Sequence, residues 1–410
     1  MSRSEILRSG PLRALLVAEV ISTTGAQMTW LALPWFVLTT TGSAGRMTLV
    51  ILAELAGLAL AGIPAGTFVQ RTGARKAMLI ADAVRAPLML LVPILHWTGH
   101  LSLGALLLLA GLLGMLAAPY FTAQKVIVPE IVGEDEGVLS QANALFQGAI
   151  RLTLLLGPPL GGVLIGVIGA ANVLVVDGVT YLVSFALVAS FVPRREPAPA
   201  TGSGGFLEGL RFLGREPLLR AWVPLFVVGD AAWQAFFATV PVLTIDRYGA
   251  NATIAGALFA GFGAGALFGN FLSFRWLASR VEGLRLIAVS VPFQALPLWV
   301  LTLHPSAPVA FTALVASGIG NGICNPSIHS IFVLRMPEGI RAKAMAAATT
   351  IWGLGTPIGL IFAGPVLAKL GPQPVLVGFA AAQTLAMTGI AISCLRARAP
   401  APSPVPAVEA

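Results

Sequence analysis

The chain has 410 residues, of which 57% are hydrophobic and only 10% charged, and its formal net charge is +8. A soluble domain carries roughly a quarter charged residues, so this composition argues against a soluble globule and against a disordered chain. The basic residues fall in short clusters between apolar runs, without a basic stripe or stacking aromatics, which argues against nucleic-acid binding. The composition predicts an all-α polytopic membrane protein.

Twelve apolar runs are long enough to span a membrane, which takes about 20 residues. They cover residues 14–38, 47–69, 77–98, 101–124, 139–168, 171–192, 221–245, 252–278, 285–303, 307–333, 344–368 and 373–396. Within the polar stretch 193–220, apolar residues at helical spacing (Phe206, Leu210, Leu213 and Leu218) predict a short amphipathic helix. The predicted organisation is an N-terminal six-helix half (1–192), a cytoplasmic linker (193–220), a C-terminal six-helix half (221–397) and a disordered Ala/Pro-rich tail (398–410).

Lys and Arg residues indicate how the chain is oriented in the membrane. Nearly all of them fall in one set of alternating loops and at the two ends of the chain, and only Arg46, Arg247 and Lys369 fall in the other set. Because cytoplasmic loops carry the excess of Lys and Arg, we expect both termini to be cytoplasmic.

The two predicted halves show a weak correspondence in sequence. Pro129-Glu130 follows the fourth span and Pro337-Glu338 follows the tenth, while Gly157-Pro158 in the fifth span corresponds to Gly355-Thr356-Pro357 in the eleventh. Such matching positions indicate an internal duplication, which is frequent in transporters.

Two motifs carry a resemblance to a known family. The loop after the second span reads GTFVQRTGARK, with Gly66, Gln70, Arg71, Gly73, Arg75 and Lys76, and it resembles the loop signature of the major facilitator superfamily. In the fifth span, Gly148 and the run Gly157-Pro158-Pro159-Leu160-Gly161-Gly162 resemble the motif of that superfamily's antiporters. The segments GAQMTWLALPWFVL, PEIVGEDEGVLSQANAL and LEGLRFL are similar to its twelve-helix drug-exporter branch, which includes macrolide and siderophore exporters. The resemblance implies the major facilitator fold, with twelve transmembrane helices in two pseudo-symmetric halves.

One position departs from the family pattern. Gln70 stands where the family usually has an acidic residue that helps to hold a charge network at the cytoplasmic gate. Arg71, Arg75 and Lys76 therefore lack that local partner, and we expect Asp82 or another carboxylate to replace it.

The glycine motif of the fifth span has two interpretations. Small residues let membrane helices approach closely, and Gly157-Pro158 loosens the helix so that it can bend. One interpretation is that the motif is only a packing site. The other, implied by the resemblance, is that the bend biases the protein towards export.

Five acidic residues lie within predicted spans, where each charge costs about 2.5–3.5 kcal/mol at a helix centre. They are Glu19, Glu54, Asp82, Asp177 and Asp230. Asp230 lies about ten residues inside its span and therefore near the midplane, which makes it the first candidate for a proton or substrate site. The resemblance implies that spans one, four, seven and ten line a central cavity, as they do in the major facilitator superfamily, and Asp230 is on span seven. The alternative is a structural ion pair, for instance with Arg151.

We expect different roles for the other four acids. Glu19 and Glu54 are alternative proton-coupling candidates. Asp82 and Arg85 lie three residues apart and are expected to pair on one helix face, which helps to anchor the gate loop. Asp177 is expected to partner a neighbouring helix.

Neutral polar and aromatic residues within the spans are candidates for a substrate cavity. They are Gln27, Trp30, Trp233, Gln234, Asn325 and His329, and the basic Arg151 of the fifth span is a further cavity candidate. His329 could be a proton relay or a hydrogen-bonded packing residue. The sequence has no nucleotide-binding P-loop, no His/Cys metal set and no nucleophile elbow, so we expect no cofactor, no metal site and no ATP-driven transport on this chain.

The sequence thus predicts a secondary transporter that exports small amphipathic compounds by proton antiport and alternating access. We expect a monomer in a bacterial plasma membrane, with the bilayer, a small-molecule substrate and protons as its partners. The alternatives are an importer of a nutrient or a lipid mover on the same fold, and a non-transporting sensor. A membrane enzyme would need clustered catalytic residues at one membrane face, and the sequence has none.

Overall fold

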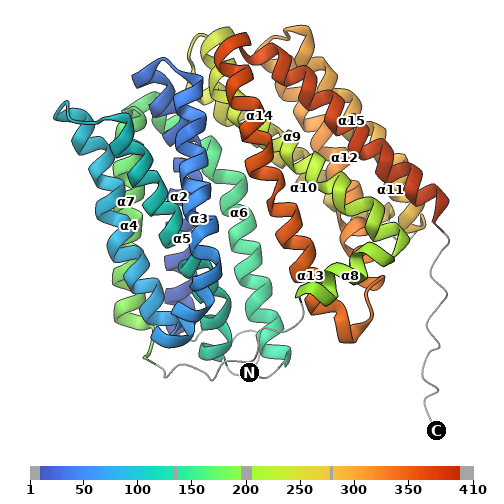
Figure 1. Cartoon of the computed structure of the whole chain (residues 1–410), viewed down its shortest axis with the longest axis horizontal. Coiled ribbons are helices and arrows are strands. Elements are labelled where there is room, and N and C mark those ends of the chain that lie inside the picture. Colours follow the sequence, from blue (N-terminus) through green and yellow to red (C-terminus); the bar gives the residue numbers. More distant parts are fainter. Residues whose placement is uncertain (1–9, 133–135, 195–205, 278–279, 398–410) are drawn as a thin grey trace. The chain divides into compact units, whose positions relative to one another are not determined.

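The computed structural model describes residues 10–132, 136–194, 206–277 and 280–397, and all regular structure within them is helical (Figure 1). The helices are α2 (Gly10–Thr41), α3 (Ala44–Thr72), α4 (Ala74–Trp97), α5 (Leu103–Val132), α6 (Glu136–Ile168), α7 (Ala170–Phe191), α8 (Phe206–Arg215), α9 (Pro217–Arg247), α10 (Ala252–Leu272), α11 (Gly283–Ala295), α12 (Ala307–Leu334), α13 (Glu338–Gly353), α14 (Gly355–Leu370) and α15 (Pro372–Arg396). A π-helical turn (Ser273–Leu277) extends α10, and a 3₁₀ helix (Leu296–Leu303) extends α11. In lipid each backbone group needs a partner within the protein, which a helix supplies within its own segment.

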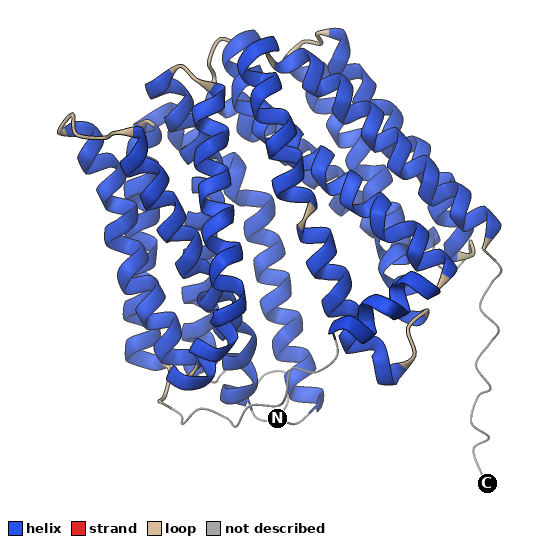
Figure 2. Cartoon of the chain, viewed as in Figure 1, coloured by secondary structure: helices blue, strands red, loops and turns tan. Residues whose placement is uncertain are grey.

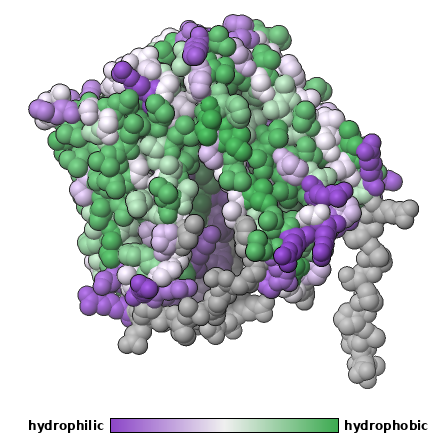
Figure 3. Space-filling view, in the orientation of Figure 1, coloured by the Kyte–Doolittle hydropathy of each residue, from purple (hydrophilic) through white to green (hydrophobic). Residues whose placement is uncertain are grey.

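Eleven candidate membrane spans lie in the described residues. Each coincides, within several residues, with one of the predicted apolar runs. The first predicted run, 14–38, lies in α2, which is not among the eleven because polar side chains such as Glu19 and Thr29 lower its hydropathy. Twelve spans in two six-helix halves therefore stay a prediction. On the face seen in Figure 3, apolar residues cover the flanks of the helices and hydrophilic residues gather at their ends.

The predicted span 344–368 is not one continuous helix. It is divided into α13 and α14 by a break at Leu354, which Figure 2 shows as a short loop. The cause is local, because Gly353 and Gly355 flank the break and both are poor helix formers. Pro357 follows in the first turn of α14, where its missing N–H is not needed.

A short helix, α8, lies where the linker was predicted to form an amphipathic helix, but Leu218 of the predicted apolar face belongs to α9. Leu213 is buried, whereas Leu207 and Leu210 are exposed. α8 packs against α13, where the Lys343 Nζ atom lies 2.6 Å from the Glu208 carboxylate. Residues 195–205 of the linker and the predicted tail 398–410 lie outside the described residues.

The chain forms two compact units. The first contains the described residues of 1–202, 235–260 and 360–375, and the second those of 203–234, 261–359 and 376–397. The core of the first unit is built mainly from α2, α4, α5, α6 and α7. That of the second is built from α8, α9, α11, α12, α13 and α15.

Candidate functional site

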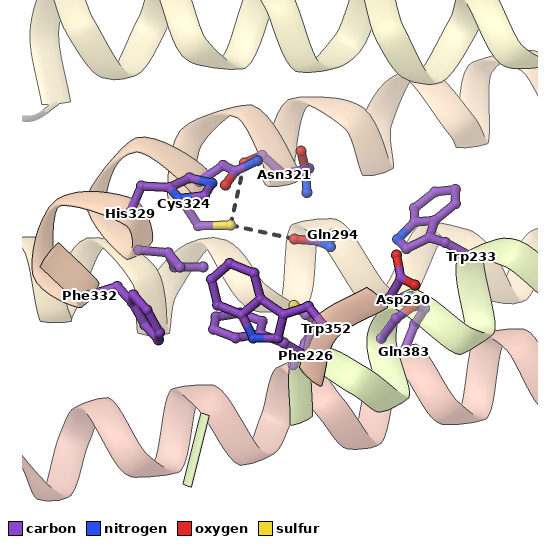
Figure 4. A pocket seen from close by; sticks show the side chains of 14 residues that line it. Phe226, Asp230, Trp233, Gln294, Asn321, Cys324, His329, Phe332, Trp352 and Gln383 are labelled. Atoms are coloured by element: carbon purple, nitrogen blue, oxygen red, sulfur yellow. Dashed lines mark hydrogen bonds between the residues drawn. The ribbon is translucent and has the colours of Figure 1, made fainter. Parts of the chain in front are cut away.

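A pocket of about 260 Å³ lies in the second unit, among α9, α11, α12, α13 and α15. Its lining residues are Phe226, Gly229, Asp230, Trp233, Gln294, Asn321, Cys324, Asn325, Ile328, His329, Phe332, Trp352, Gln383 and Met387. Figure 4 shows Asp230 and Gln383 at one end of the pocket and His329 and Phe332 at the other. The volume is slightly below the roughly 300–1,000 Å³ that is typical of ligand pockets.

Three aromatic rings form one wall of this pocket. The centroid of the Trp352 ring lies 5.3 Å from that of Phe226 and 5.0 Å from that of Phe332, both with the rings inclined to each other. Such edge-to-face and tilted arrangements are the favoured ones for aromatic pairs. The wall therefore offers a preformed apolar surface, with ring faces that attract cations.

Two buried polar atoms of the pocket lining have no hydrogen-bond partner. They are the indole Nε1 of Trp352, a donor, and the side-chain oxygen of Gln383, an acceptor. The amide nitrogen of Gln383 is already used, because it donates to the Gly229 carbonyl at 2.7 Å. Buried polar groups are rarely left unpaired, but both atoms are themselves inaccessible, so a ligand in the pocket reaches them only when the surrounding side chains move.

Asp230 lies beside the break between α13 and α14. Its carboxylate accepts a hydrogen bond of 3.1 Å from the Thr356 hydroxyl in the first turn of α14. A Cβ atom added to Gly355 would lie 2.7 Å from the same carboxylate oxygen. The helix N-terminus favours a nearby negative charge, and the absence of a side chain at Gly355 makes this close approach possible.

The pocket lining carries one carboxylate and, among its described residues, neither Lys nor Arg. Asp230 therefore has no Lys or Arg partner in the lining, and the hydroxyl that donates to it from Thr356 is neutral. His329 lies at the other end of the pocket (Figure 4). Together with the aromatic wall, this charge distribution fits an amphipathic ligand that carries a positive charge.

The predicted cavity residues are divided between the two units. Asp230, Trp233, Asn325 and His329 line the pocket, and Gln234 lies beside Asp230. Sequence reasoning missed Gln294, Gln383 and Trp352. A signal was present for the two glutamines, since an amide inside an apolar span is unusual, but none distinguished Trp352 from an interfacial anchor.

Three predicted cavity residues belong to the first unit and are not in this pocket. The Cβ of Gln27 on α2 packs against Gly157 of α6. Trp30 is 40% exposed and contacts the rings of Phe237 and Phe259, at centroid distances of 4.8 and 5.6 Å. Arg151 is exposed on α6.

The first unit contains a buried acidic cluster. Glu19 on α2 accepts hydrogen bonds from Thr23, at 2.8 Å, and from the hydroxyl of Tyr120 on α5, at 3.1 Å. Asp177 on α7 accepts a bond of 2.7 Å from Thr29 on α2, which confirms that it partners a neighbouring helix.

Arg85 is the only buried Lys or Arg side chain in the described part of the chain. The expected pairing of Asp82 with Arg85 is not seen as a hydrogen bond or a close ion pair, although the two groups interact electrostatically. Arg85 donates instead to the Tyr181 hydroxyl at 2.7 Å, and neither Asp82 oxygen has a hydrogen-bond partner. The tyrosine ring lies 4.1 Å from the guanidinium and holds it by a cation–π contact.

The gate-loop motif forms a one-residue connection between α3 and α4. Gly73 has a φ of 82°, a conformation that suits glycine. Arg75 donates to the carbonyls of Val192, at 2.6 Å, and Ala189, at 2.7 Å, so it caps the C-terminus of α7. The expectation that a carboxylate such as Asp82 replaces the missing acidic partner is therefore wrong for Arg75, whose partners are carbonyls.

The remaining residues of this motif lie on the surface of the first unit. Gln70, Arg71 and Lys76 are exposed. Gly66 is half-buried, and a Cβ there would meet nothing within 4 Å. None of these four residues has the positive φ seen at Gly73.

The glycine motif of α6 is a packing surface. Gly157 and Gly161 lie against Gln27 and Met28 of α2, and Gly162 lies against Gly256 of α10. Gly148 differs, because a Cβ there would meet nothing within 4 Å. α6 runs through Pro158 without interruption, so this geometry matches the packing interpretation for three of the glycines.

Comparisons with known proteins agree with this architecture. A family model described as Major Facilitator Superfamily matches residues 15–360. The multidrug efflux pump Tap of Mycobacterium tuberculosis is 25% identical, and the alignment covers 88% of each chain. The enterobactin exporter EntS of Citrobacter koseri is also 25% identical, over 90% of this chain and 88% of its own length.

A solved structure supports the fold alone. The crystal structure of the nucleoside transporter NupG superposes with a TM-score of 0.74, at 12% identity. The match covers 93% of this chain and 99% of NupG.

Proposed function

Because the chain belongs to the Major Facilitator Superfamily, and is thus a membrane transporter and not an enzyme, we propose that it exports small amphipathic cations in exchange for protons. The pocket of the second unit carries this proposal. Asp230 supplies a negative charge at one end, and Phe226, Phe332 and Trp352 supply an apolar wall with cation-attracting faces.

Three further features of the proposal come from the sequence and the relatives. Two relatives are named as an efflux pump and an exporter, which supports export as the direction. The distribution of Lys and Arg supports cytoplasmic termini in a bacterial plasma membrane. Proton antiport can supply the free energy for export against a concentration gradient. Each elementary charge that moves down the membrane potential releases about 2.3 kcal/mol per 100 mV. We propose that a single chain does this by alternating access.

Efflux of ethidium, a fluorescent organic cation, from energised cells tests this function. Asp230→Asn removes the charge and keeps the shape of the side chain, whereas Asp246→Asn changes an exposed acid at the end of the same helix, α9. We expect wild type and Asp246→Asn to expel the dye, an uncoupler to stop them, and Asp230→Asn to lose most of the efflux. Undiminished efflux by Asp230→Asn would contradict recognition of a cation by this pocket. Dye accumulation driven by the wild type would contradict export.

A further inference from the structure

Two complementary buried groups on α4 remain unpaired although they lie one helical turn apart. Both carboxyl oxygens of Asp82 are buried without a hydrogen-bond partner, and so is the Nε atom of Arg85. Residues three apart on a helix are within reach of each other. An ionised carboxylate at Asp82 would therefore be expected to draw the guanidinium towards it.

The guanidinium is held by tyrosines instead. Its terminal nitrogen donates to the Tyr181 hydroxyl at 2.7 Å, and it lies 4.1 Å from the Tyr181 ring centroid and 5.6 Å from that of Tyr120. These contacts join α4 to α7 and α5. A buried, unpaired charge is expensive, and a carboxyl group in that position avoids the cost by keeping its proton. The observed arrangement is the one expected around a neutral Asp82.

The other acids near this site differ from Asp82 in their contacts. Glu19 on α2 and Asp177 on α7 each accept hydrogen bonds from hydroxyl groups on a neighbouring helix, which stabilise a carboxylate. Glu54 on α3 is only half-buried. The Ser184 hydroxyl on α7 faces Asp82 but lies outside hydrogen-bonding geometry. Among these four acids, Asp82 is the one whose two carboxyl oxygens are both buried without a hydrogen-bond partner.

We propose that Asp82 is the proton-binding group of this transporter and that its proton determines the position of Arg85. When Asp82 is neutral, Arg85 stays on Tyr181 and ties α4 to α7. Release breaks the O–H bond of the carboxylic acid and passes the proton to water. The resulting carboxylate then draws the guanidinium from Tyr181 into a pair within α4. The contact between α4 and α7 is lost, which couples proton release to movement of helices.

This proposal deepens the proposed function, because it assigns the proton of the antiport to the first unit while the substrate cation binds in the second. The charged and titratable groups around Asp82 and Arg85 are Glu19 on α2, Glu54 on α3, Tyr120 on α5, and Asp177 and Tyr181 on α7. A test has to distinguish Asp82 from each of the other acids.

Infrared difference spectroscopy of the purified protein, taken between acid and alkaline pH, makes that distinction. We expect the wild type to lose a carboxylic-acid C=O band, together with a change in the tyrosine ring bands as Arg85 leaves Tyr181. Asp82→Asn is expected to lose both signals, and Asp82→Glu to restore a shifted C=O band. Asp177→Asn, which changes a buried acid of the same cluster, is the matched control for the C=O band and is expected to keep it. Because Asp177 also contacts Tyr181, the tyrosine bands are compared only between the wild type and the two Asp82 variants.

The outcomes separate this site from the proposed function. A C=O band that persists in Asp82→Asn, or is missing from the wild type, overturns the assignment even if dye efflux is stopped by an uncoupler. A band lost only in Asp82→Asn, with efflux that is indifferent to an uncoupler, supports the proton site and overturns coupled export. Loss of the C=O band without the tyrosine change would overturn the movement of Arg85. Recovery in Asp82→Glu shows that the loss in Asp82→Asn is not caused by misfolding.

Discussion

At the scale of single residues, the absence of a side chain at Gly355 determines where Asp230 can lie. A Cβ at this position would approach the Asp230 carboxylate oxygen to 2.7 Å and its Cβ to 2.8 Å, which is closer than real Cβ contacts. We therefore expect Gly355→Ala to displace the carboxylate and to weaken ethidium binding by roughly tenfold, about 1.4 kcal/mol. Fluorescence titration of the purified protein measures this affinity.

Gly353 provides the matched control for this change. It lies two residues earlier, on the other side of the break at Leu354, is exposed, and a Cβ added there would meet nothing within 4 Å. We expect Gly353→Ala to bind the dye as the wild type does. Equal affinities for wild type and Gly355→Ala would show that the carboxylate does not need its present position to bind the cation.

Sequence reasoning at this scale succeeds where a residue's own position carries the signal. The position of Asp230, about ten residues inside a predicted span, marked it as a candidate site residue, and the structure places it in the lining of a pocket. The spacing of Asp82 and Arg85 correctly put them on one face of α4, yet no hydrogen bond joins them. The competing partner, Tyr181, is 96 residues away in the chain, and nothing local in the sequence reports such a contact.

At the scale of secondary structure, one arginine connects two helices of the first unit. Arg75, at the start of α4, donates to two carbonyls at the C-terminus of α7, where four carbonyls have no partner within the helix. Removing it leaves these carbonyls without a charged donor. We expect Arg75→Gln to lower the free energy of unfolding by about 1–2 kcal/mol. This is less than the roughly 1.5–3 kcal/mol of a buried hydrogen bond from a charged group, because the site is only half-buried.

Thermal unfolding of the purified protein measures this effect, and Lys76→Gln is its control. Lys76 is the next residue, has the same charge and is exposed, so we expect its replacement to leave the melting temperature unchanged. If the two variants melt together, the contacts of Arg75 with α7 contribute nothing to stability, and the basic residues of the loop act only through their charge.

The elements themselves were largely predictable, and their interruptions were not. Apolar runs of spanning length fixed the positions of the helices to within several residues, because the length of a run is a local property. The break at Leu354 lies inside a run that looks continuous. Gly353, Gly355 and Pro357 gave the signal for it, but Gly157-Pro158, which looks similar in the sequence, lies in the uninterrupted α6.

At the scale of the whole molecule, α2 decides between eleven and twelve spans and hence the side on which each terminus lies. Its 32 residues make a helix of about 48 Å, longer than the roughly 30 Å hydrocarbon core. The polar side chains that lower its hydropathy face other helices of the first unit, since Glu19 binds Tyr120 and Thr29 binds Asp177. Hydropathy averaged over all faces of the helix therefore underestimates its ability to cross the membrane.

We expect α2 to cross, with its N-terminal end in the cytoplasm. In a background without Cys324 and Cys394, a cysteine replaces either Arg13 or Arg46, exposed residues near the start of α2 and just after its end. A membrane-impermeant maleimide should label Arg46→Cys in intact cells and Arg13→Cys only after permeabilisation. Arg215→Cys on α8 is the cytoplasmic control, expected to behave as Arg13→Cys. If Arg13→Cys and Arg46→Cys react from the same side, α2 does not cross. The chain would then have eleven spans with its termini on opposite sides, and the two halves could not be related as equal six-helix repeats.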